Sequence, residues 1–285
     1  MNAKIIKIIS NRYTVITEDN KQHIAVAMGK LRLGKSPVVG DNVIIEERDN
    51  KMIIEKILPR KNYLVRPLIA NIDQAIIVMS AKDPEFSATL VDRLLFLIVN
   101  MNIEPLICVT KMDLSDEETF KFIDDYKKSG YKVILVEKGK HNDELPLIFK
   151  DKISVLTGQS GVGKSTLLND LNPDFNLKTQ ETSKALGRGK HTTRHCELHY
   201  VASGWVGDTP GFSSLDFDDI DADTLKDCVL DFRKYSDGCK FRNCLHLNEP
   251  GCNIKKCVEN NEISSIRYKN YLDVLKIIQE RKEKY

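Results

Sequence analysis

A glycine-rich segment in the middle of the chain has the residue types and the spacing of a phosphate-binding loop. Its residues are Gly158, Gln159, Ser160, Gly161, Val162, Gly163, Lys164, Ser165 and Thr166. In such a loop the glycines permit a tight path, and backbone N–H groups converge on phosphate oxygens at the start of a helix. The ammonium group of Lys164 would bridge the terminal phosphates of a nucleotide, and the hydroxyl of Ser165 would bind Mg²⁺. The segment therefore predicts nucleotide binding together with a magnesium ion.

A second segment, Asp208-Thr209-Pro210-Gly211, follows the strand-like residues Gly204-Trp205-Val206. It has the pattern of an element whose aspartate, here Asp208, holds Mg²⁺ through water and whose glycine, here Gly211, senses the γ-phosphate. Residues 187–194, between the two segments, are rich in glycine, charge and hydroxyl groups, which is typical of a switch loop. Either Thr192 or Thr193 could coordinate Mg²⁺ there; we assign Thr193 and keep Thr192 as the alternative.

A guanine-reading motif precedes these segments. Thr110, Lys111, Met112 and Asp113 follow the strand-like run 105–109. The Asp113 carboxylate could accept hydrogen bonds from the N1–H and 2-amino groups of guanine, which adenine cannot match. The stem of Lys111 would cover the base, and Thr110 stands where asparagine is usual. Because ordinary GTPases place this motif after the phosphate-binding loop, the order of motifs in this chain is rotated.

The set of residues for hydrolysis is incomplete. Many GTPases place a glutamine directly after the glycine of the second segment, where it orients the attacking water. Phe212 holds that position here and cannot hydrogen-bond to water. We therefore expect slow hydrolysis by the chain alone. The candidate catalytic residues are Lys164 and His191, although His191 fits a surface or ligand-orienting role as well.

Four of the seven cysteines crowd into one short segment near the C-terminus. Together with a histidine they suggest a metal site, with the candidate ligands Cys239, Cys244, His246 and Cys252. Three thiolates and one imidazole are a usual tetrahedral set for a structural Zn²⁺ ion, and they leave no open position for catalysis. In a cytosolic chain such clustering favours a metal over disulfide bonds. Cys257 could replace Cys252, but we expect the set that includes Cys252.

The chain divides into three regions, and the first, residues 1–66, precedes all of the candidate site residues. It holds short apolar and β-branched runs separated by turn signals, which predicts a small barrel of short strands. The runs are 5–9, 13–17, 23–27, 43–45 and 52–58. We expect an OB-type barrel that binds RNA, with an SH3-like barrel as the alternative, because OB barrels commonly carry nucleic acid on one face.

Two further regions follow. Residues 67–215 alternate strands and helices, which predicts an α/β domain with a parallel sheet. Its strands are expected at 74–79, 105–109, 131–136 and 153–156, and its helices at 88–100, 116–129 and 145–149. Residues 216–285 would form a small, mainly helical zinc-binding domain. Its final helix has an expected apolar face made of Ile263, Ile266, Leu272, Leu275 and Ile278.

Bulk properties limit the class of protein. The 285 residues are 41% hydrophobic and 29% charged, which is ordinary for a soluble chain. No apolar run approaches the roughly 20 residues needed to cross a bilayer, so we expect no membrane partner and a cytoplasmic location. Residues 1–66 carry 13 Lys or Arg against 7 Asp or Glu. This excess suggests a polyanionic partner, although a solvated lysine-rich surface would give the same count.

The combined motifs are more specific than any one of them. With the barrel, the rotated order and the cysteine cluster, the chain resembles the ribosome small-subunit-dependent GTPase A family over essentially its whole length. The resemblance implies a circularly permuted GTPase that binds GTP or GDP with Mg²⁺ and carries one structural zinc. It also implies binding to the small ribosomal subunit and its rRNA late in assembly, with hydrolysis stimulated by the subunit. Phe212 fits the hydrophobic replacement of the catalytic glutamine in this family.

Other functions are compatible with parts of the pattern. The chain could be an RNA-binding adaptor in which the nucleotide mainly stabilises the fold. It could also be a P-loop ATPase or a small-molecule kinase if Asp113 does not read guanine. We expect a monomer.

Overall fold

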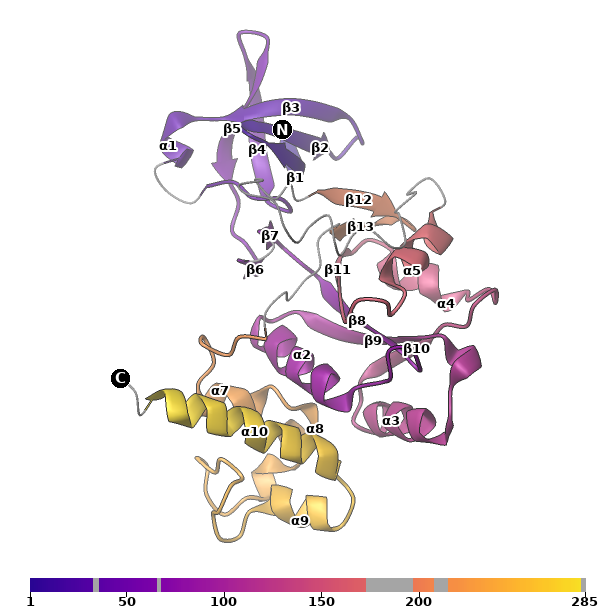
Figure 1. Ribbon diagram of the computed structural model, residues 1–285. Helices are drawn as coiled ribbons and strands as arrows, with labels where there is room; N and C mark the ends of the chain where they lie inside the picture. The colour runs from indigo at the N-terminus through magenta and orange to yellow at the C-terminus, as the bar shows by residue number, and fades with distance from the viewer. Residues whose placement is uncertain (33–35, 66–67, 173–196, 208–214, 283–285) are drawn as a thin grey trace. The chain divides into compact units, whose positions relative to one another are not determined.

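The computed structural model describes residues 1–32, 36–65, 68–172, 197–207 and 215–282 (Figure 1). The chain divides into two compact units, each built from separate stretches of sequence. The first unit comprises residues 1–76 and 141–213, and the second comprises residues 77–140 and 214–285. Within the described ranges, none of the helices combines the length and the apolar character that a membrane span requires. The domain boundaries expected at 66 and 215 stay a prediction.

A closed barrel forms the N-terminal part of the first unit. Its strands are β1 (Asn2–Ile9), β2 (Arg12–Thr17), β3 (Gln22–Ala27), β4 (Asn42–Arg48) and β5 (Lys51–Ile57). The order around the barrel is β1-β2-β3-β5-β4, and β4 pairs back onto β1. β3 and β5 run parallel, whereas the other neighbours are antiparallel. This closed five-stranded barrel confirms the OB-type prediction.

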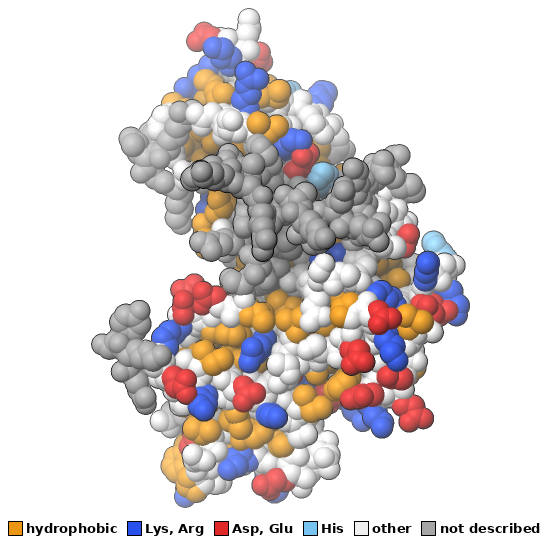
Figure 2. All heavy atoms as spheres, in the orientation of Figure 1, with side chains coloured by type: hydrophobic (Ala, Val, Ile, Leu, Met, Phe, Trp, Pro, Cys, Tyr) orange, Lys and Arg blue, Asp and Glu red, His pale blue; other side chains and the backbone are white. Residues whose placement is uncertain are grey.

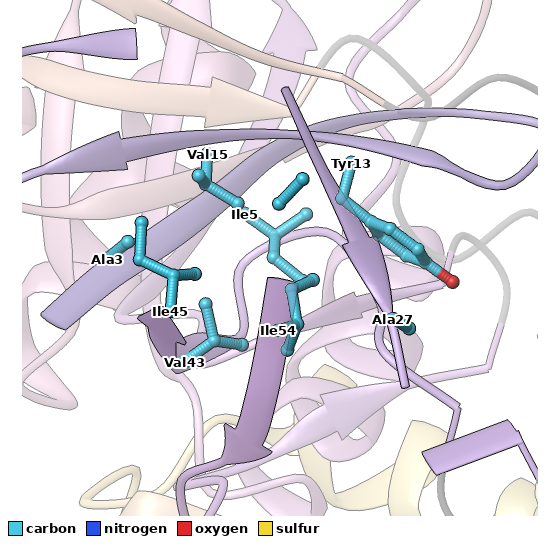
Figure 3. Close-up of a cluster of buried hydrophobic side chains, with 9 residues drawn as sticks. Ala3, Ile5, Tyr13, Val15, Ala27, Val43, Ile45 and Ile54 are labelled. Carbon is cyan, nitrogen blue, oxygen red and sulfur yellow. The ribbon is translucent and has the colours of Figure 1, made fainter. Parts of the chain in front are cut away.

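The barrel is filled by apolar side chains from all of its strands (Figure 3). The buried set is Ala3, Ile5, Tyr13, Val15, Ala25, Ala27, Val43, Ile45 and Ile54. Alternate residues point inward because successive side chains of a strand face opposite sides. The short helix α1 (Gly29–Arg32) follows β3 and packs Leu31 against this core. The sequence pattern does not predict α1, because one turn of helix is too short to show a period.

The α/β region contains a six-stranded sheet with the order β10-β9-β8-β11-β13-β12. The strands are β8 (Gln74–Ser80), β9 (Glu104–Thr110), β10 (Lys132–Leu135), β11 (Ile153–Thr157), β12 (Leu198–Val201) and β13 (Gly204–Gly207). β9 runs parallel to β10, and β11 runs parallel to β13, whereas β12 is antiparallel to β13. Every residue of β8 and β11 is buried, as the continuous apolar runs predict. The sequence does not predict β12 or the short antiparallel pair β6 (Tyr63–Leu64) and β7 (Ile69–Ala70).

The helices of this region are α2 (Ala88–Asn100), α3 (Glu117–Lys128), α4 (Glu144–Phe149) and α5 (Lys164–Leu171), with a 3₁₀ turn η1 (Met112–Leu114). Side-chain caps fix two of the helix starts. The Ser87 hydroxyl accepts from the backbone N–H of Leu90, and the Asp116 carboxylate accepts from that of Thr119. Such caps satisfy backbone donors that have no partner inside the helix. The expected helices at 88–100, 116–129 and 145–149 are therefore confirmed within about one residue.

The C-terminal region is mainly helical, as expected. Its elements are α7 (Ala222–Asp227), α8 (Leu230–Tyr235), η3 (Ser236–Gly238), α9 (Asn253–Glu259) and α10 (Ser265–Lys282). The expected apolar face of α10 was wrong at two positions, because Ile266 is 44% exposed and Ile263, although buried, precedes the helix. The buried stripe instead follows Arg267, Tyr271, Val274 and Ile278 at helical spacing, and Ile266 lies off it. A search for apolar residues cannot identify this face, because the buried residue at its centre is an arginine.

Arg267 ties four helices of the second unit together and is 1% exposed. Its guanidinium contacts Asp92 of α2 at 3.3 Å, Asp125 of α3 at 2.8 Å, and Asp231 of α8. Burial lowers the pKa of Arg267, but the carboxylates of Asp92 and Asp231 outweigh burial and raise it. The arginine therefore stays charged at every physiological pH, and its ion pairs fix α8 and α10 to helices α2 and α3.

We expect Arg267→Ala to lower the free energy of unfolding by about 3–5 kcal/mol, because it leaves Asp92 and Asp231 buried without a counter-charge. Urea-induced unfolding followed by circular dichroism at neutral pH measures this change. Lys276→Ala is the matched control on the same helix. Its ion pair with Glu280 is exposed, so the loss should stay below about 1 kcal/mol. Equal losses for the two variants would show that the buried cluster does not stabilise the fold.

Candidate nucleotide and metal sites

The phosphate-binding segment lies between a buried strand and a helix. β11 ends at Thr157, and α5 begins at Lys164. Val162 is fully buried and anchors the loop, while Leu167 and Leu168 anchor the helix. This strand, loop and helix form the local structure that the motif predicts.

The glycines of the loop adopt backbone angles that other residues rarely reach. Their φ angles are 134° at Gly158, 85° at Gly161 and 95° at Gly163. A side chain at these positions would be strained, because left-handed conformations cost L-residues free energy. The glycine spacing of the motif is therefore required by the path of the chain.

The side chain of Lys164 folds back over the loop. Its Nζ donates to the carbonyl oxygens of Gly158 at 2.8 Å and Gln159 at 2.6 Å. Burial lowers the pKa of Lys164. The ammonium group is thus held above the loop backbone, where a phosphate oxygen could take the place of either carbonyl. Ser165 and Thr166 follow in the first turn of α5, with Thr166 exposed.

The guanine-reading motif begins at the carboxyl end of β9. Lys111 has a left-handed backbone with φ of 54°, and Met112 to Leu114 form η1. The carboxylate-bearing side chain of Asp113 is exposed, and the Lys111 ammonium group donates to the Asp83 carbonyl. The motif therefore presents its aspartate to solvent from a short, ordered turn.

Thr110 holds this turn to the neighbouring strands. Its hydroxyl donates to the Met79 carbonyl of β8 at 3.2 Å, and its own carbonyl accepts from the N–H of Ala81 at 2.9 Å. The N–H of Met112 donates to the Val136 carbonyl at 3.2 Å. Thr110 is 5% exposed, so these bonds are shielded from water. A threonine in place of asparagine therefore still fixes the loop to the sheet.

Several predicted site residues lie outside the described residues. They are His191, Thr192, Thr193, Asp208, Gly211 and Phe212. Their roles as magnesium ligands, phosphate sensors or catalytic groups stay predictions. Of the two predicted protein ligands of magnesium, Ser165 lies within the described part of the chain.

The structure brings the four predicted metal ligands together. The ligand atoms of Cys239, Cys244, His246 and Cys252 all lie within 4.8 Å of one another. His246 Nδ1 is 3.7 Å from Cys239 Sγ and 3.5 Å from Cys252 Sγ. Sulfur and nitrogen ligands of one tetrahedral zinc ion lie about 3.5–3.8 Å apart, given its bond lengths. The four residues therefore fit a single metal ion, and Cys257 lies outside this cluster.

Residues around the cluster, which the sequence reasoning missed, fix its backbone. The hydroxyls of Tyr268 and Tyr271 each donate at 2.6 Å, to the carbonyls of His246 and Leu245 respectively. The Glu249 carboxylate accepts from backbone N–H groups of Leu245, Leu247 and Asn248. Phe232 packs edge-on against the His246 ring at 5.1 Å. The tyrosine spacing on one helix face is the sequence signal that could have indicated this support.

The protonation chemistry of the cluster suits a metal. Burial lowers the pKa of His246 to about 4, so its imidazole is neutral at pH 7 and Nδ1 can donate a lone pair. Burial raises the pKa of the Cys244 thiol to about 12. A bound cation would reverse this cost, because a coordinating thiol is deprotonated.

Comparisons with known proteins agree with this arrangement. Residues 57–218 match the model of the family described as RsgA GTPase. The chain is 47% identical to the small ribosomal subunit biogenesis GTPase RsgA of Bacillus pumilus, over 99% of both chains. It is 49% identical to RsgA 2 of Oceanobacillus iheyensis, which carries the same description, again over 99% of both chains.

Two solved structures have the same fold. The crystal structure of YloQ, described as a circularly permuted GTPase, matches with a TM-score of 0.85 and 40% identity, covering 98% of this chain and 95% of that one. YjeQ from Thermotoga maritima matches with a TM-score of 0.85 and 33% identity, covering 98% of each chain. The rotated order of motifs is thus a circular permutation of the fold. The family match over more than half of the chain, with relatives alike over nearly its full length, shows that the chain belongs to the RsgA GTPase family.

Proposed function

We propose that this chain is a GTP-hydrolysing assembly factor that binds the small ribosomal subunit and its rRNA during late maturation. Contact with the subunit would stimulate hydrolysis, and hydrolysis would drive release. The observation that carries the proposal is the rotated pair of motifs, each following the carboxyl end of a strand of the six-stranded sheet. The description of the curated relatives as small ribosomal subunit biogenesis GTPases supports the choice of partner. We propose a cytoplasmic monomer.

The phosphates of GTP would be bound by the loop that follows β11. Backbone N–H groups from Gly158 to Gly163 would donate to phosphate oxygens, and the Lys164 ammonium group would exchange its two loop carbonyls for oxygens of the terminal phosphates. The Ser165 hydroxyl would bind Mg²⁺, which supplies positive charge to the phosphates when bound. Asp208 and Thr193 would complete that site, with Thr192 as the alternative to Thr193.

Guanine would be recognised by the exposed Asp113 at the end of β9. Its carboxylate can accept two hydrogen bonds from guanine, and hydrogen bonds to a charged group are stronger than those to a neutral one. Lys111 would exchange its contact with the Asp83 carbonyl for a position along the base. Thr110 would keep the turn attached to β8 throughout.

We expect Asp113→Asn to weaken GTP binding by about tenfold or more and to improve binding of xanthosine triphosphate. With its Oδ1 accepting from N1–H, the asparagine side chain would donate from Nδ2 to the 2-oxo group of xanthine, whereas Nδ2 cannot accept from the 2-amino group of guanine. Competition binding with GTP, xanthosine triphosphate and ATP measures the change. Asp124→Asn, at an exposed position of α3, is the control. Unchanged base preference in the Asp113 variant would favour an ATPase or kinase.

The cysteine and histidine cluster would hold one structural zinc ion. The zinc would fix the segment between η3 and α9, which has few apolar residues of its own. Acidic and basic side chains are interspersed over the helices of the second unit (Figure 2), in agreement with 13 Lys or Arg against 14 Asp or Glu in residues 216–285. The basic barrel is therefore the more favourable region for rRNA.

The function is tested by GTP hydrolysis with and without purified small subunits, large subunits and free RNA. We expect turnover well below about one per second for the chain alone, because no glutamine follows Gly211. Small subunits should raise this rate strongly, whereas large subunits should not. Equal rates under all conditions, with RNA binding that ignores the nucleotide, would instead identify an RNA-binding adaptor.

A further inference from the structure

A groove in the first unit lies between the outer face of the barrel and the hairpin formed by β12 and β13. Its volume is about 540 Å³. An ion pair between Lys7 of β1 and Glu197 at 2.6 Å joins the two walls, and the same residues form an isolated bridge. The β12–β13 hairpin (orange in Figure 1) belongs to the same sheet as β11, the strand that leads into the phosphate-binding loop. The nucleotide and metal sites described above use none of the groove residues.

The barrel wall of the groove carries apolar side chains that point to solvent. Ile9 is 48% exposed and Ile24 is 64% exposed, and both line the groove. Thr14 lies opposite Ile24 in the β2–β3 register, and His23 adds an imidazole beside it. The core of the barrel is already filled from its inner face, so these residues serve no packing role there. Clustered exposed apolar side chains often mark an interaction site.

The hairpin wall carries two aromatic residues. Tyr200 and Trp205 are directly paired across β12 and β13, with ring centroids 5.2 Å apart and planes at 64°. Tyr200 is 59% exposed, and the Trp205 side chain is half-buried. The edge-to-face arrangement holds the rings in place while leaving aromatic surface in the groove.

The charges around the groove favour a ligand with flat neutral groups and a negative backbone. The Glu197 carboxylate is paired with Lys7, so the groove interior is close to neutral. Arg12 is exposed beside this wall, opposite Ile9 in the β1–β2 register. The surrounding barrel sequence, residues 1–66, carries an excess of six positive charges. Single-stranded nucleic acid combines flat neutral bases, which match the aromatic side chains, with negative phosphates, which match the basic surroundings.

We propose that this groove binds unpaired nucleobases of RNA, with Trp205 and Tyr200 as the stacking surface and the basic barrel against the phosphates. Single-stranded RNA is recognised by stacking of splayed bases on aromatic side chains, and OB barrels bind oligonucleotides beside β2 and β3. The inference deepens the proposed function, because the RNA would be an exposed single-stranded segment of the small subunit. The groove would then connect rRNA contact to the sheet that carries the phosphate-binding loop.

Trp205 is the single tryptophan of the chain, so its fluorescence reports on this groove directly. We expect a short single-stranded oligoadenylate to quench Trp205 fluorescence on binding. An abasic oligonucleotide of the same length, which keeps the phosphates and lacks the bases, should bind about tenfold weaker and cause no quenching. Equal binding and equal fluorescence with the two probes would overturn the proposal, because binding would then be due to phosphate contacts alone.

Two variants separate stacking from a general loss of structure. Tyr200→Ala removes an exposed ring and should weaken oligoadenylate binding about tenfold. Phe120→Ala, at a 47% exposed aromatic position of α3 outside the groove, should change binding less than twofold. A Tyr200 variant that binds oligoadenylate like the wild type would exclude stacking in this groove.

Parallel measurements with intact small subunits distinguish this proposal from the proposed function. If small subunits stimulate GTP hydrolysis but oligoadenylate neither binds nor quenches Trp205 fluorescence, the groove proposal is overturned and the proposed function stands. Weaker subunit binding of the Tyr200 variant, with no Trp205 response to oligoadenylate, would also overturn it, because the groove would then contact a ribosomal protein. Absence of stimulation and of subunit binding in the wild type would overturn the proposed function, whatever oligoadenylate does.

Discussion

Replacing Lys164 with alanine is expected to reduce small-subunit-stimulated GTP hydrolysis by about a hundredfold or more. Lys164 is the ammonium group held over the phosphate-binding loop by the carbonyls of Gly158 and Gln159. In the proposed reaction it stabilises negative charge that grows on the transferring phosphoryl group. Removal of one preorganised electrostatic donor typically costs 10²–10³ in rate, or roughly 3–4 kcal/mol. Single-turnover hydrolysis with saturating small subunits measures the effect on the chemical step.

The matched control is Lys132→Ala, which removes an exposed lysine from β10. It should hydrolyse GTP at the wild-type rate. Thermal unfolding of both variants separates a loss of chemistry from a loss of structure, since Lys164 also contacts its own loop. A folded Lys164 variant with a rate within about twofold of the wild type would be incompatible with the phosphate-binding role.

Replacing Cys252 with serine is expected to abolish binding of the zinc ion proposed for this cluster and to loosen the segment that contains the four candidate ligands. Cys252 Sγ lies 3.5 Å from His246 Nδ1 within the cluster and is nearly buried. Structural zinc sites contribute roughly 10–16 kcal/mol of binding free energy at pH 7, and this stabilises the folded segment. Zinc release measured by a colorimetric chelator should fall from about one ion per chain to near zero. Limited proteolysis should detect new cleavage between Cys239 and Cys252.

Cys257→Ser provides the control, because Cys257 is buried like Cys244 and Cys252 but lies outside the cluster. It should keep its zinc and its resistance to protease. The sequence left Cys257 open as a substitute for Cys252, and the pair of variants decides between them. Loss of zinc from the Cys257 variant, with retention by the Cys252 variant, would reverse the assignment.

The sequence predicted most of the fold because its signals were local. Buried parallel strands appear as continuous apolar runs, and the barrel strands alternate between filled interior and solvent, so period and turn residues locate them. The helices with side-chain caps were predicted within about one residue. Very short elements escaped detection. α1, β6, β7 and β12 hold few residues each and are stabilised by their neighbours rather than by their own pattern.

The sequence likewise predicted some features of the candidate sites and missed others. Ligand spacing located the metal cluster, because cysteine and histidine chemistry is carried by residue type. The support from Tyr268 and Tyr271 was missed, since it consists of contacts between a helix face and loop residues 22 and 26 positions away in the sequence. The support from Glu249 was missed because it depends on how the loop folds around its own carboxylate. Thr110 stands where asparagine is usual, and the structure shows its hydroxyl bonded to the carbonyl of Met79 in the adjacent strand.

The sequence by itself predicted the phosphate-binding and guanine-reading segments. It also determined their rotated order and the cysteine and histidine residues that the fold brings together. Each of these depends on residue type and short spacing, and the backbone between the residues can take few paths. The tertiary structure decided that Arg267 would be buried among three carboxylates and that Tyr200 and Trp205 would face the outer wall of the barrel. Both arrangements join residues far apart in the chain. Their free energy comes from burial and charge pairing that exist once the elements have packed, and no local pattern encodes them.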